Sequence, residues 1–338
     1  MLSNQTIIYN LEMKTYQQLW QSLTPLYDAG EAQAIVRTVL DVKYGMTLTD
    51  IICGKVNELS ADEGRKLEEI IIRLQKGEPV QYVLGEADFA GRTFHVEPGV
   101  LIPRPETAEL CQWIEEDMAV KSTVSSEVFS EDSPQAPDDA RQILDICTGS
   151  GCIAITLGLN IPNSEVTGWD ISEDALRIAQ GNVKMLKARN VRIEYQDALA
   201  LRKAAETDNE KMKVNADKEV VKPKGEAKAP STQKWDMIVS NPPYICEKEK
   251  ADMEKNVLEH EPSIALFVPD EDPLKFYRAI AEYASSSLKS GGALYFEINP
   301  IYEKETRKML EELGFKDIET KEDAFGKKRM MKAKNNKE

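Results

Sequence analysis

The feature that most constrains this chain is an alternation of short β-rich runs with helical stretches, beginning near residue 142. Such alternation predicts a doubly wound α/β fold built on a parallel sheet. Ligands in these folds bind outside the carboxyl ends of the strands, so the residues that follow each run are the candidate site residues. The runs are Ile143–Ile146, Val166–Trp169, Val191–Tyr195, Trp235–Val239 and Ala293–Ile298.

The 338 residues exceed the usual size of one domain, and the part before the alternation follows a different pattern. Ser60 and Glu63 have the spacing of a capping box ahead of an apolar helical face. We therefore predict a small helical domain over residues 1–76. A β-hairpin linker is predicted over 77–106, because Val80–Pro105 contains aromatic and β-branched residues and glycines without a helical period.

The remaining residues, 107–338, are predicted to form the catalytic domain. Two polar stretches in it, 120–139 and 203–233, contain few large apolar residues and are predicted to be flexible inserts. A helix is predicted to start at Ser172, with acidic residues in its first turn that suit the helix dipole.

The composition limits the possible functions and locations. A net charge of -15 argues against a dedicated nucleic-acid binder. Five cysteines without a C-x-x-C pair and only two histidines predict neither disulfides nor a metal site. No apolar run approaches the length of a membrane span, and the N-terminal residues lack the apolar core of a signal peptide, so we expect a cytoplasmic protein without a membrane segment.

A glycine-rich loop follows the first strand and is the candidate cofactor site. Gly149 and Gly151 allow a sharp turn and a close approach of the backbone to a ligand, with Thr148 beside them. The second strand ends in Asp170, where a carboxylate can accept from both hydroxyls of a ribose. This pattern predicts a nucleoside ligand.

Two nucleoside-containing ligands are candidates, S-adenosylmethionine and NAD, because the glycines also match the looser fingerprint of an NAD-dependent oxidoreductase. Asp145 favours S-adenosylmethionine, since a carboxylate attracts a cationic methionine group and repels a pyrophosphate. Asp197, after the third strand, can accept from an adenine amino group, or it can form an Asx turn. Cys147 stands where such loops often have glycine, and we expect it to keep φ negative.

The fourth strand leads into Asn241-Pro242-Pro243-Tyr244, the candidate acceptor site. An amide or exocyclic amine nitrogen is a weak nucleophile, so a site for its methylation must position it and accept its hydrogens. The Asn241 side-chain oxygen and the Pro242 carbonyl are two suitable acceptors, Pro243 restricts the backbone, and Tyr244 can stack on a flat group. The motif predicts nitrogen methylation, although in most proteins Asn-Pro-Pro forms only a turn.

Several further motifs resemble the protein-(glutamine-N5) methyltransferases of the HemK/PrmC type. They are Gln81-Tyr82 with Gly85, Phe89-x-Gly91, Leu101 to Thr107 (Leu-Ile-Pro-Arg-Pro-Glu-Thr), the Gly149/Gly151 loop, Asn241 to Tyr244, and Glu261-Pro262-Ser263-x-Ala265-Leu266. The resemblance spans nearly the whole chain. Asn-Pro-Pro-Tyr alone is shared with adenine-N6 methyltransferases of DNA and RNA, which leaves that activity as the alternative.

The resemblance implies a Rossmann-like class I methyltransferase: a mainly parallel seven-stranded sheet with an antiparallel last strand, and a helical N-terminal domain that helps to dock the substrate. It further implies methyl transfer from S-adenosylmethionine to the glutamine of the Gly-Gly-Gln motif in peptide chain release factors. By the same resemblance Arg104, Pro105, Glu106 and Thr107 would border the active site and cofactor, with substrate contacts from Arg104 and Glu106. From the residues alone, these two would form a surface ion pair.

Overall fold

The computed structural model describes residues 14–126, 140–201 and 234–336. The chain divides into two compact units. The helical unit comprises the residues up to 86 together with 254–260, and the sheet unit comprises 87–253 and 261–338. The predicted insert at 203–233 and most of the one at 120–139 lie outside the described residues.

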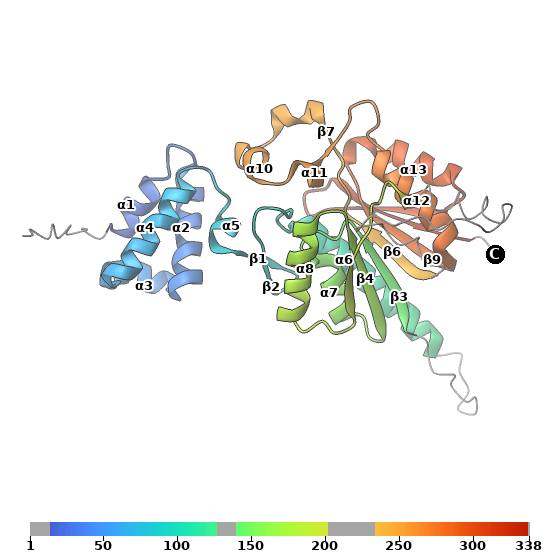
Figure 1. The fold of residues 1–338 in the computed structure, drawn as a ribbon, viewed down its shortest axis with the longest axis horizontal. Helices are drawn as coiled ribbons and strands as arrows, with labels where there is room; N and C mark the ends of the chain where they lie inside the picture. Colours follow the sequence, from blue (N-terminus) through green and yellow to red (C-terminus); the bar gives the residue numbers. More distant parts are fainter. Residues whose placement is uncertain (1–13, 127–139, 202–233, 337–338) are drawn as a thin grey trace, which may run out of the picture. The chain divides into compact units, whose positions relative to one another are not determined.

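The helical unit is built from helices (Figure 1), and residues between Leu19 and Leu84 form its apolar core. Ser60 forms the predicted capping box with Glu63, and Val36, Leu40 and Leu67 are buried in the core. The elements are α1 (Tyr16–Gln21), α2 (Ala29–Tyr44), α3 (Leu48–Ile52), η1 (Lys55–Glu58), α4 (Ala61–Leu74), α5 (Val80–Leu84) and α10 (Lys255–His260).

The prediction of a hairpin over Val80–Pro105 is wrong for its first residues. Val80–Leu84 forms helix α5, which starts after Pro79 and ends at Gly85 with φ 77°. A five-residue helix is too short to display a 3.6-residue period, which explains why the sequence pattern missed it. The paired strands are confined to β1 (Glu86–Phe89) and β2 (Arg92–His95).

The sheet unit contains a seven-stranded sheet in the order β10-β11-β9-β6-β3-β4-β5. Strand β11 runs antiparallel to both of its neighbours, and the other neighbouring strands are parallel. This confirms the predicted fold class. The strands are β3 (Arg141–Ile146), β4 (Ser164–Asp170), β5 (Val191–Tyr195), β6 (Trp235–Ser240), β9 (Leu288–Glu297), β10 (Lys316–Glu322) and β11 (Lys328–Lys334).

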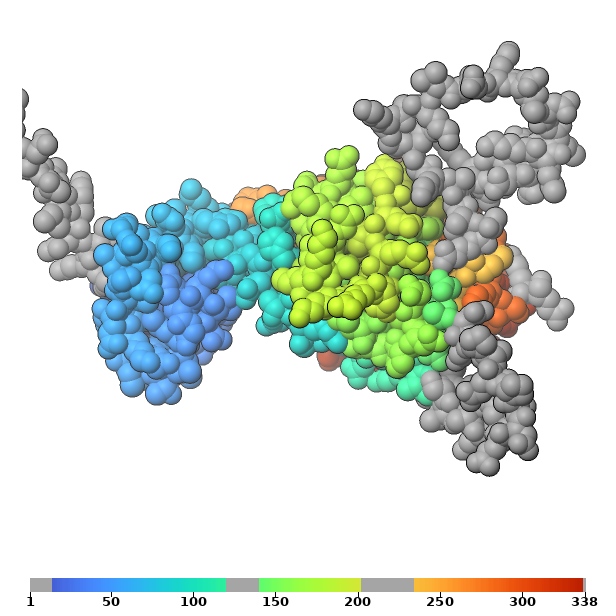
Figure 2. Space-filling model, turned by 60° about the horizontal axis from the view of Figure 1, so that its bottom comes forward, coloured from blue at the N-terminus to red at the C-terminus, as the bar shows by residue number. Residues whose placement is uncertain are grey.

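Helices cover both faces of this sheet (Figure 1). One face packs on α6 (Pro105–Ser126), α7 (Cys152–Asn160) and α8 (Glu173–Met185), and the other on α12 (Lys275–Ser287) and α13 (Glu303–Glu312). Alternate residues of the inner strands β3, β4, β6, β9 and β11 supply the two cores, because successive side chains point to opposite faces. Figure 2 shows the surface of the sheet unit over which the segment from α7 to β5 lies, in green and yellow-green.

Helix α6 corrects the predicted boundary of the first insert. It continues to Ser126, so residues 120–126 are helical rather than part of a loop that begins at Val120. Ser and Thr dominate that last stretch, and their weak helix propensity hid the continuation. The predicted helix start at Ser172 is confirmed, since the Ser172 side chain accepts from the backbone N–H of Ala175.

Short elements connect β6 to α12 and β9 to α13. They are β7 (Ile245–Cys246), η2 (Glu247–Asp252), α11 (Ser263–Leu266), β8 (Phe267–Val268) and η3 (Pro300–Tyr302), with β7 and β8 paired in parallel. Over the described part of the chain, none of the helices has the length and apolarity needed to cross a membrane. Among the same residues, no group of three or more His, Cys, Asp or Glu side chains is placed to hold a metal ion.

Candidate active site

A cavity of about 260 Å³ lies in the sheet unit at the carboxyl ends of β3, β4 and β6. Four segments contribute most of its wall: residues 99–107, the loop after β3, the residues after β4 and β5, and the motif after β6. Of the predicted site residues, the wall contains Thr148, Gly149, Asp170, Asp197, Asn241, Pro243 and Arg104. Most of this wall is apolar, with the carboxylates and amides at defined positions.

The loop between β3 and α7 turns through three left-handed residues. Gly149 has φ 56° and Gly151 has φ 81°. A Cβ on Gly151 would meet Ile155 Cδ1 at 3.1 Å and Ala179 Cβ at 3.2 Å, so this position also allows α7 and α8 to approach each other. Cys147 has φ 63°, which overturns the expectation of a negative angle there. The tight turn requires this conformation, at a cost of roughly 1–2 kcal/mol for a residue with a Cβ.

Asp145 lies beneath this loop and is fully buried. Its Oδ2 accepts from Thr148 Oγ1 at 2.6 Å and from the backbone N–H of Ala154 at 3.1 Å. Its Oδ1 has no hydrogen-bond partner among the residues described. Burial raises the pKa of Asp145 to about 7. The carboxylate therefore holds the loop in place, and its contact with a cofactor stays a prediction.

Asp170 closes β4 and faces the cavity. Its two oxygens accept from the backbone N–H groups of Gly149 and Ser172, each at 2.9 Å. An ionised carboxylate has about four acceptor positions, so it can accept further hydrogens from a ligand. Asp197 also lines the cavity, and its side chain accepts from the backbone N–H of Leu199 at 2.8 Å. That bond is the Asx turn considered as the alternative role, and both roles are compatible in this position.

Asn241 projects from the end of β6 into a chain of hydrogen bonds with Thr107 and Glu297. The Asn241 side-chain NH2 donates to Thr107 Oγ1 at 3.1 Å, and Thr107 Oγ1 donates to Glu297 Oε2 at 2.5 Å. Both Thr107 and Glu297 are 2% exposed. These three side chains come from segments far apart in the sequence, and the fold brings them together at one edge of the cavity.

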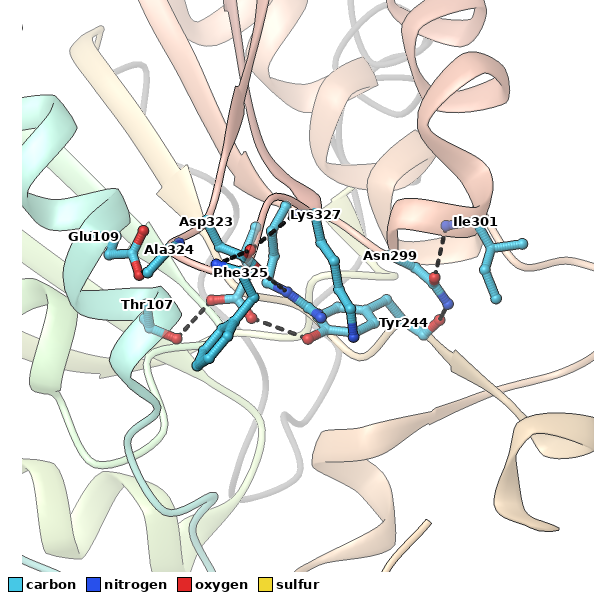
Figure 3. A network of polar contacts seen from close by, with 11 residues as sticks. Thr107, Glu109, Tyr244, Asn299, Ile301, Asp323, Ala324, Phe325 and Lys327 are labelled. Carbon is cyan, nitrogen blue, oxygen red and sulfur yellow. Dashed lines mark hydrogen bonds and ion pairs between the residues drawn. The ribbon is translucent and has the colours of Figure 1, made fainter. Parts of the chain in front are cut away.

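Tyr244 occupies the other side of Glu297. Its hydroxyl donates to Glu297 Oε1 at 2.9 Å, and Figure 3 shows Thr107 and Tyr244 pointing at the same carboxylate from opposite sides. The Tyr244 ring packs against the core on the α12 and α13 face. The structure thus gives Tyr244 an anchoring contact, and its stacking on an acceptor stays a prediction. Pro242 and Pro243 are buried, with Pro243 in the cavity wall.

Arg104 does not pair with Glu106, so that interpretation is wrong. The Arg104 guanidinium forms an ion pair with Glu261, whose other oxygen accepts from the backbone N–H of Ile102 at 3.0 Å. Glu261 is 5% exposed, and pairing with a cation offsets the cost of burying it. These contacts join two of the motifs that resemble the glutamine methyltransferases, Leu101 to Thr107 and Glu261 to Leu266. Glu106 is half-buried and lies outside the cavity wall.

Sequence reasoning missed one residue of this cluster. Glu297 lay inside a run interpreted only as a β-rich strand, whereas Thr107 was expected beside the active site from the family resemblance alone. The signal for Glu297 was available: it is an acid at the carboxyl end of a strand, as Asp170 is. Four predicted site residues lie outside the cavity wall besides Glu106, namely Asp145, Gly151, Pro242 and Tyr244.

Two family profiles match the chain. The profile described as a methyltransferase domain matches residues 137–312, and the one described as a PrmC N-terminal domain matches residues 24–85. The first covers the described strands from β3 to β9 and the whole candidate cofactor loop. The second covers most of the helical unit.

Curated relatives agree with these profiles. A release factor glutamine methyltransferase from Bacteroides thetaiotaomicron is 44% identical over 93% of this chain and 96% of its own length. The enzymes of the same name from Flavobacterium psychrophilum and Streptococcus pneumoniae are 35% and 34% identical, over 95% and 85% of this chain and 98% and 86% of their own lengths. With its sheet order, its glycine loop and Asn241 at the cavity, this chain belongs to the release factor glutamine methyltransferases, a family of S-adenosylmethionine-dependent enzymes.

Proposed function

We propose that this chain transfers a methyl group from S-adenosylmethionine to the side-chain amide nitrogen of a glutamine, giving N5-methylglutamine and S-adenosylhomocysteine. The proposed substrate is the Gly-Gly-Gln glutamine of peptide chain release factors. One observation carries the proposal: the Asn241 amide lies at the cavity edge, anchored through its NH2 group, in a chain that is 44% identical to a release factor glutamine methyltransferase.

The cavity residues fit the cofactor. Gly149 leaves open space where a Cβ would stand, and Asp170 retains acceptor positions suited to ribose hydroxyls. Asp145 Oδ1, which has no hydrogen-bond partner in the described part of the chain, and the Asp170 carboxylate together favour a cationic ligand over a pyrophosphate. The apolar wall suits an adenine ring, with Asp197 and Gln196 at its edge.

When bound, S-adenosylmethionine supplies a methyl group on a positively charged sulfur. The residues of this chain position the glutamine amide relative to that methyl group. The Asn241 Oδ1 and the Pro242 carbonyl accept the two hydrogens of the glutamine NH2, which turns the nitrogen lone pair toward the methyl group. One N–C bond forms as one S–C bond breaks, and the nitrogen then releases one proton to water. Holding the reactants in line contributes effective molarities of about 10⁵ M or more, so a strong base is unnecessary.

Labelled methyl transfer tests this function directly. The purified chain is incubated with methyl-labelled S-adenosylmethionine and a release factor, beside the same release factor carrying Gln→Asn in its Gly-Gly-Gln motif. Label on the unaltered protein alone is the expected result. Label that enters DNA or rRNA instead would establish the adenine methyltransferase alternative, which the net charge of -15 disfavours.

The proposal extends to partners and location. The helical unit is proposed to help dock the release factor, in line with the PrmC N-terminal domain profile that matches it. Release factors act on ribosomes, so the proposed place of action is the cytoplasm. Removing residues 1–76 should raise the KM for the release factor and leave the affinity for S-adenosylhomocysteine unchanged. An unchanged KM would contradict the docking role.

A further inference from the structure

We propose that Thr107 and Glu297 act as positioning residues: they fix which way the Asn241 side-chain amide faces, so that its oxygen is offered to the acceptor nitrogen. This inference rests on the proposed function, since it concerns the same acceptor site. It is carried by three hydrogen bonds. One runs from Asn241 to Thr107. The other two, from Thr107 and from Tyr244 to Glu297, can be followed in Figure 3.

The direction of these bonds follows from the number of hydrogens. A threonine hydroxyl has one hydrogen, and Thr107 directs it at Glu297 Oε2 over 2.5 Å. An ionised carboxylate can only accept, so it cannot reverse this bond. Thr107 Oγ1 therefore has only lone pairs to offer Asn241, and the amide NH2 must face it. In the part of the chain that the structure describes, the Asn241 side chain makes no other hydrogen bond, which leaves Oδ1 available for a substrate hydrogen.

Glu297 is itself held in one orientation. Its second oxygen accepts from the Tyr244 hydroxyl at 2.9 Å, and the carboxylate is 2% exposed. The nearby guanidinium of Arg329 favours the ionised form and is in turn paired with Asp323 at 3.0 Å. Water has little access to this carboxylate, so the hydroxyl groups of Thr107 and Tyr244 satisfy it.

Protonation of Glu297 would remove the fixed direction. A protonated carboxyl can donate to Thr107 Oγ1, whose own hydrogen is then free to point at Asn241. The amide would turn its oxygen toward Thr107 and its NH2 toward the acceptor, where it repels the substrate N–H groups. Methyl transfer should therefore need the ionised form of Glu297.

The surroundings of Glu297 determine the pH at which its carboxyl group ionises. Burial raises the pKa of Glu297 above its ordinary value, the hydrogen bonds from Thr107 and Tyr244 and the charge of Arg329 oppose the rise, and Glu106 adds to it. As the pH is lowered, kcat should therefore begin to fall at a higher pH than the ordinary pKa of a glutamate would give, because the pKa of Glu297 is raised. The titratable and charged groups around Glu297 are Glu106 and Cys111 of α6, Cys152 of α7, Tyr244, Tyr277 of α12 and Arg329 of β11.

Paired substitutions test the positioning role. Thr107→Val keeps the side-chain shape and removes the hydroxyl, and we expect kcat to fall about 10²-fold, the scale of a misplaced reacting group. The KM for S-adenosylmethionine should stay unchanged, and Thr107→Ser should restore most of the rate. Thr306→Val is the matched control, because Thr306 is fully buried and its hydroxyl has no hydrogen-bond partner among the described residues. An unaltered kcat in Thr107→Val would overturn the proposal.

A second measurement needs no turnover and no substrate. The side-chain NH2 of Asn241, assigned by its loss in Asn241→Ala, should exchange slowly in wild-type protein labelled with ¹⁵N-asparagine and should shift as Glu297 titrates. Thr107→Val should speed this exchange, and Glu297→Gln should abolish the pH-dependent shift and flatten the acid limb of kcat.

The two measurements separate two failures. A wild-type protein that does not methylate release factors would contradict the proposed function, while a slowly exchanging Asn241 NH2 would still support the positioning role. An Asn241 signal that is insensitive to both substitutions would overturn the positioning role alone.

Discussion

Asp145 and Glu297 are both buried acids near the carboxyl ends of strands, β3 and β9, yet their environments differ. Glu297 has a donor on each oxygen and a guanidinium nearby. Asp145 accepts two bonds on one oxygen and, from the residues that the structure describes, none on the other. The carboxylate at the acceptor end thus has both oxygens hydrogen-bonded and is fixed in direction, whereas the one at the cofactor end keeps a buried oxygen without a partner among the described residues. A site that must orient an amide needs the first arrangement, and one that binds a cation can use the second.

The largest effect should come from the acceptor end. Asn241→Ala removes the acceptor for a substrate hydrogen, and we expect kcat to fall about 10³-fold or more, the scale of a lost oriented hydrogen-bond partner in an active site. The affinity for S-adenosylhomocysteine, measured by calorimetry, should be unchanged. Asn160→Ala, at the exposed end of α7, serves as the control. A parallel loss of cofactor affinity would show that Asn241 also shapes the cofactor site.

Asp170→Ala should produce the opposite pattern. Losing hydrogen bonds from a charged group costs about 1.5–3 kcal/mol, so the Kd for S-adenosylhomocysteine should rise about 10- to 100-fold. The kcat at saturating cofactor should change little. Asp174→Ala, on the exposed surface of α8, gives the baseline for removing a nearby charge. If kcat fell as far as in Asn241→Ala, cofactor binding and methyl transfer would not depend on separate ends of the site.

Asp145→Asn tests the buried acid at the cofactor end through the pH dependence of the free energy of unfolding. In the folded protein the pKa of Asp145 is about 7, above the unfolded value, so the fold binds a proton that the unfolded chain has released. The free energy of unfolding should therefore decrease in the wild type as pH rises from about 5 to about 7, by roughly 2 kcal/mol from this group. The variant lacks that decrease. Denaturant unfolding at several pH values measures both, and parallel profiles would contradict the raised pKa.

The smallest effect is expected at Cys147. Glycine relieves the left-handed strain at φ 63° but gains freedom in the unfolded chain, so Cys147→Gly should change the free energy of unfolding by only about 0.5 kcal/mol. Cys147→Val should destabilise by about 2 kcal/mol, because a β-branched residue suits this angle poorly. Urea titration distinguishes the two. A destabilised glycine variant would indicate that sulfur packing outweighs strain there.

The sequence predicted the parts of the fold that depend on local periodicity and on strand ends. Five strands were located from their β-rich runs. Asp170 was found because it ends a strand, and Asn241 because it directly follows one. The strands β10 and β11 escaped a residue-level prediction, since charged residues dominate Lys316–Glu322 and Lys328–Lys334, and only the family resemblance supplied them.

The hydrogen-bond partners could not be predicted. Glu261 pairs with Arg104, and Glu297 with Thr107, across more than 150 residues of chain. Nothing local in the sequence distinguishes these partners from other acids, because a pairing of this kind depends on the tertiary arrangement of the sheet and its connections. The angle of Cys147 was mispredicted for a related reason: a turn anchored by neighbouring strands overrides the preference of the residue.

The sheet order has a consequence for how the protein assembles. Strand β11 is made after β10, yet it lies between β9 and β10 and pairs residue by residue with β9, including Met330 opposite Glu297. During synthesis, β9 therefore has an unpaired edge until residues 328–334 have left the ribosome, and β10 has no place in the sheet. Such non-local pairing is slow and leaves an edge open to other chains meanwhile. The packing around the Glu297 carboxylate is thus completed only when β11 joins the sheet, long after the cofactor loop has been synthesised.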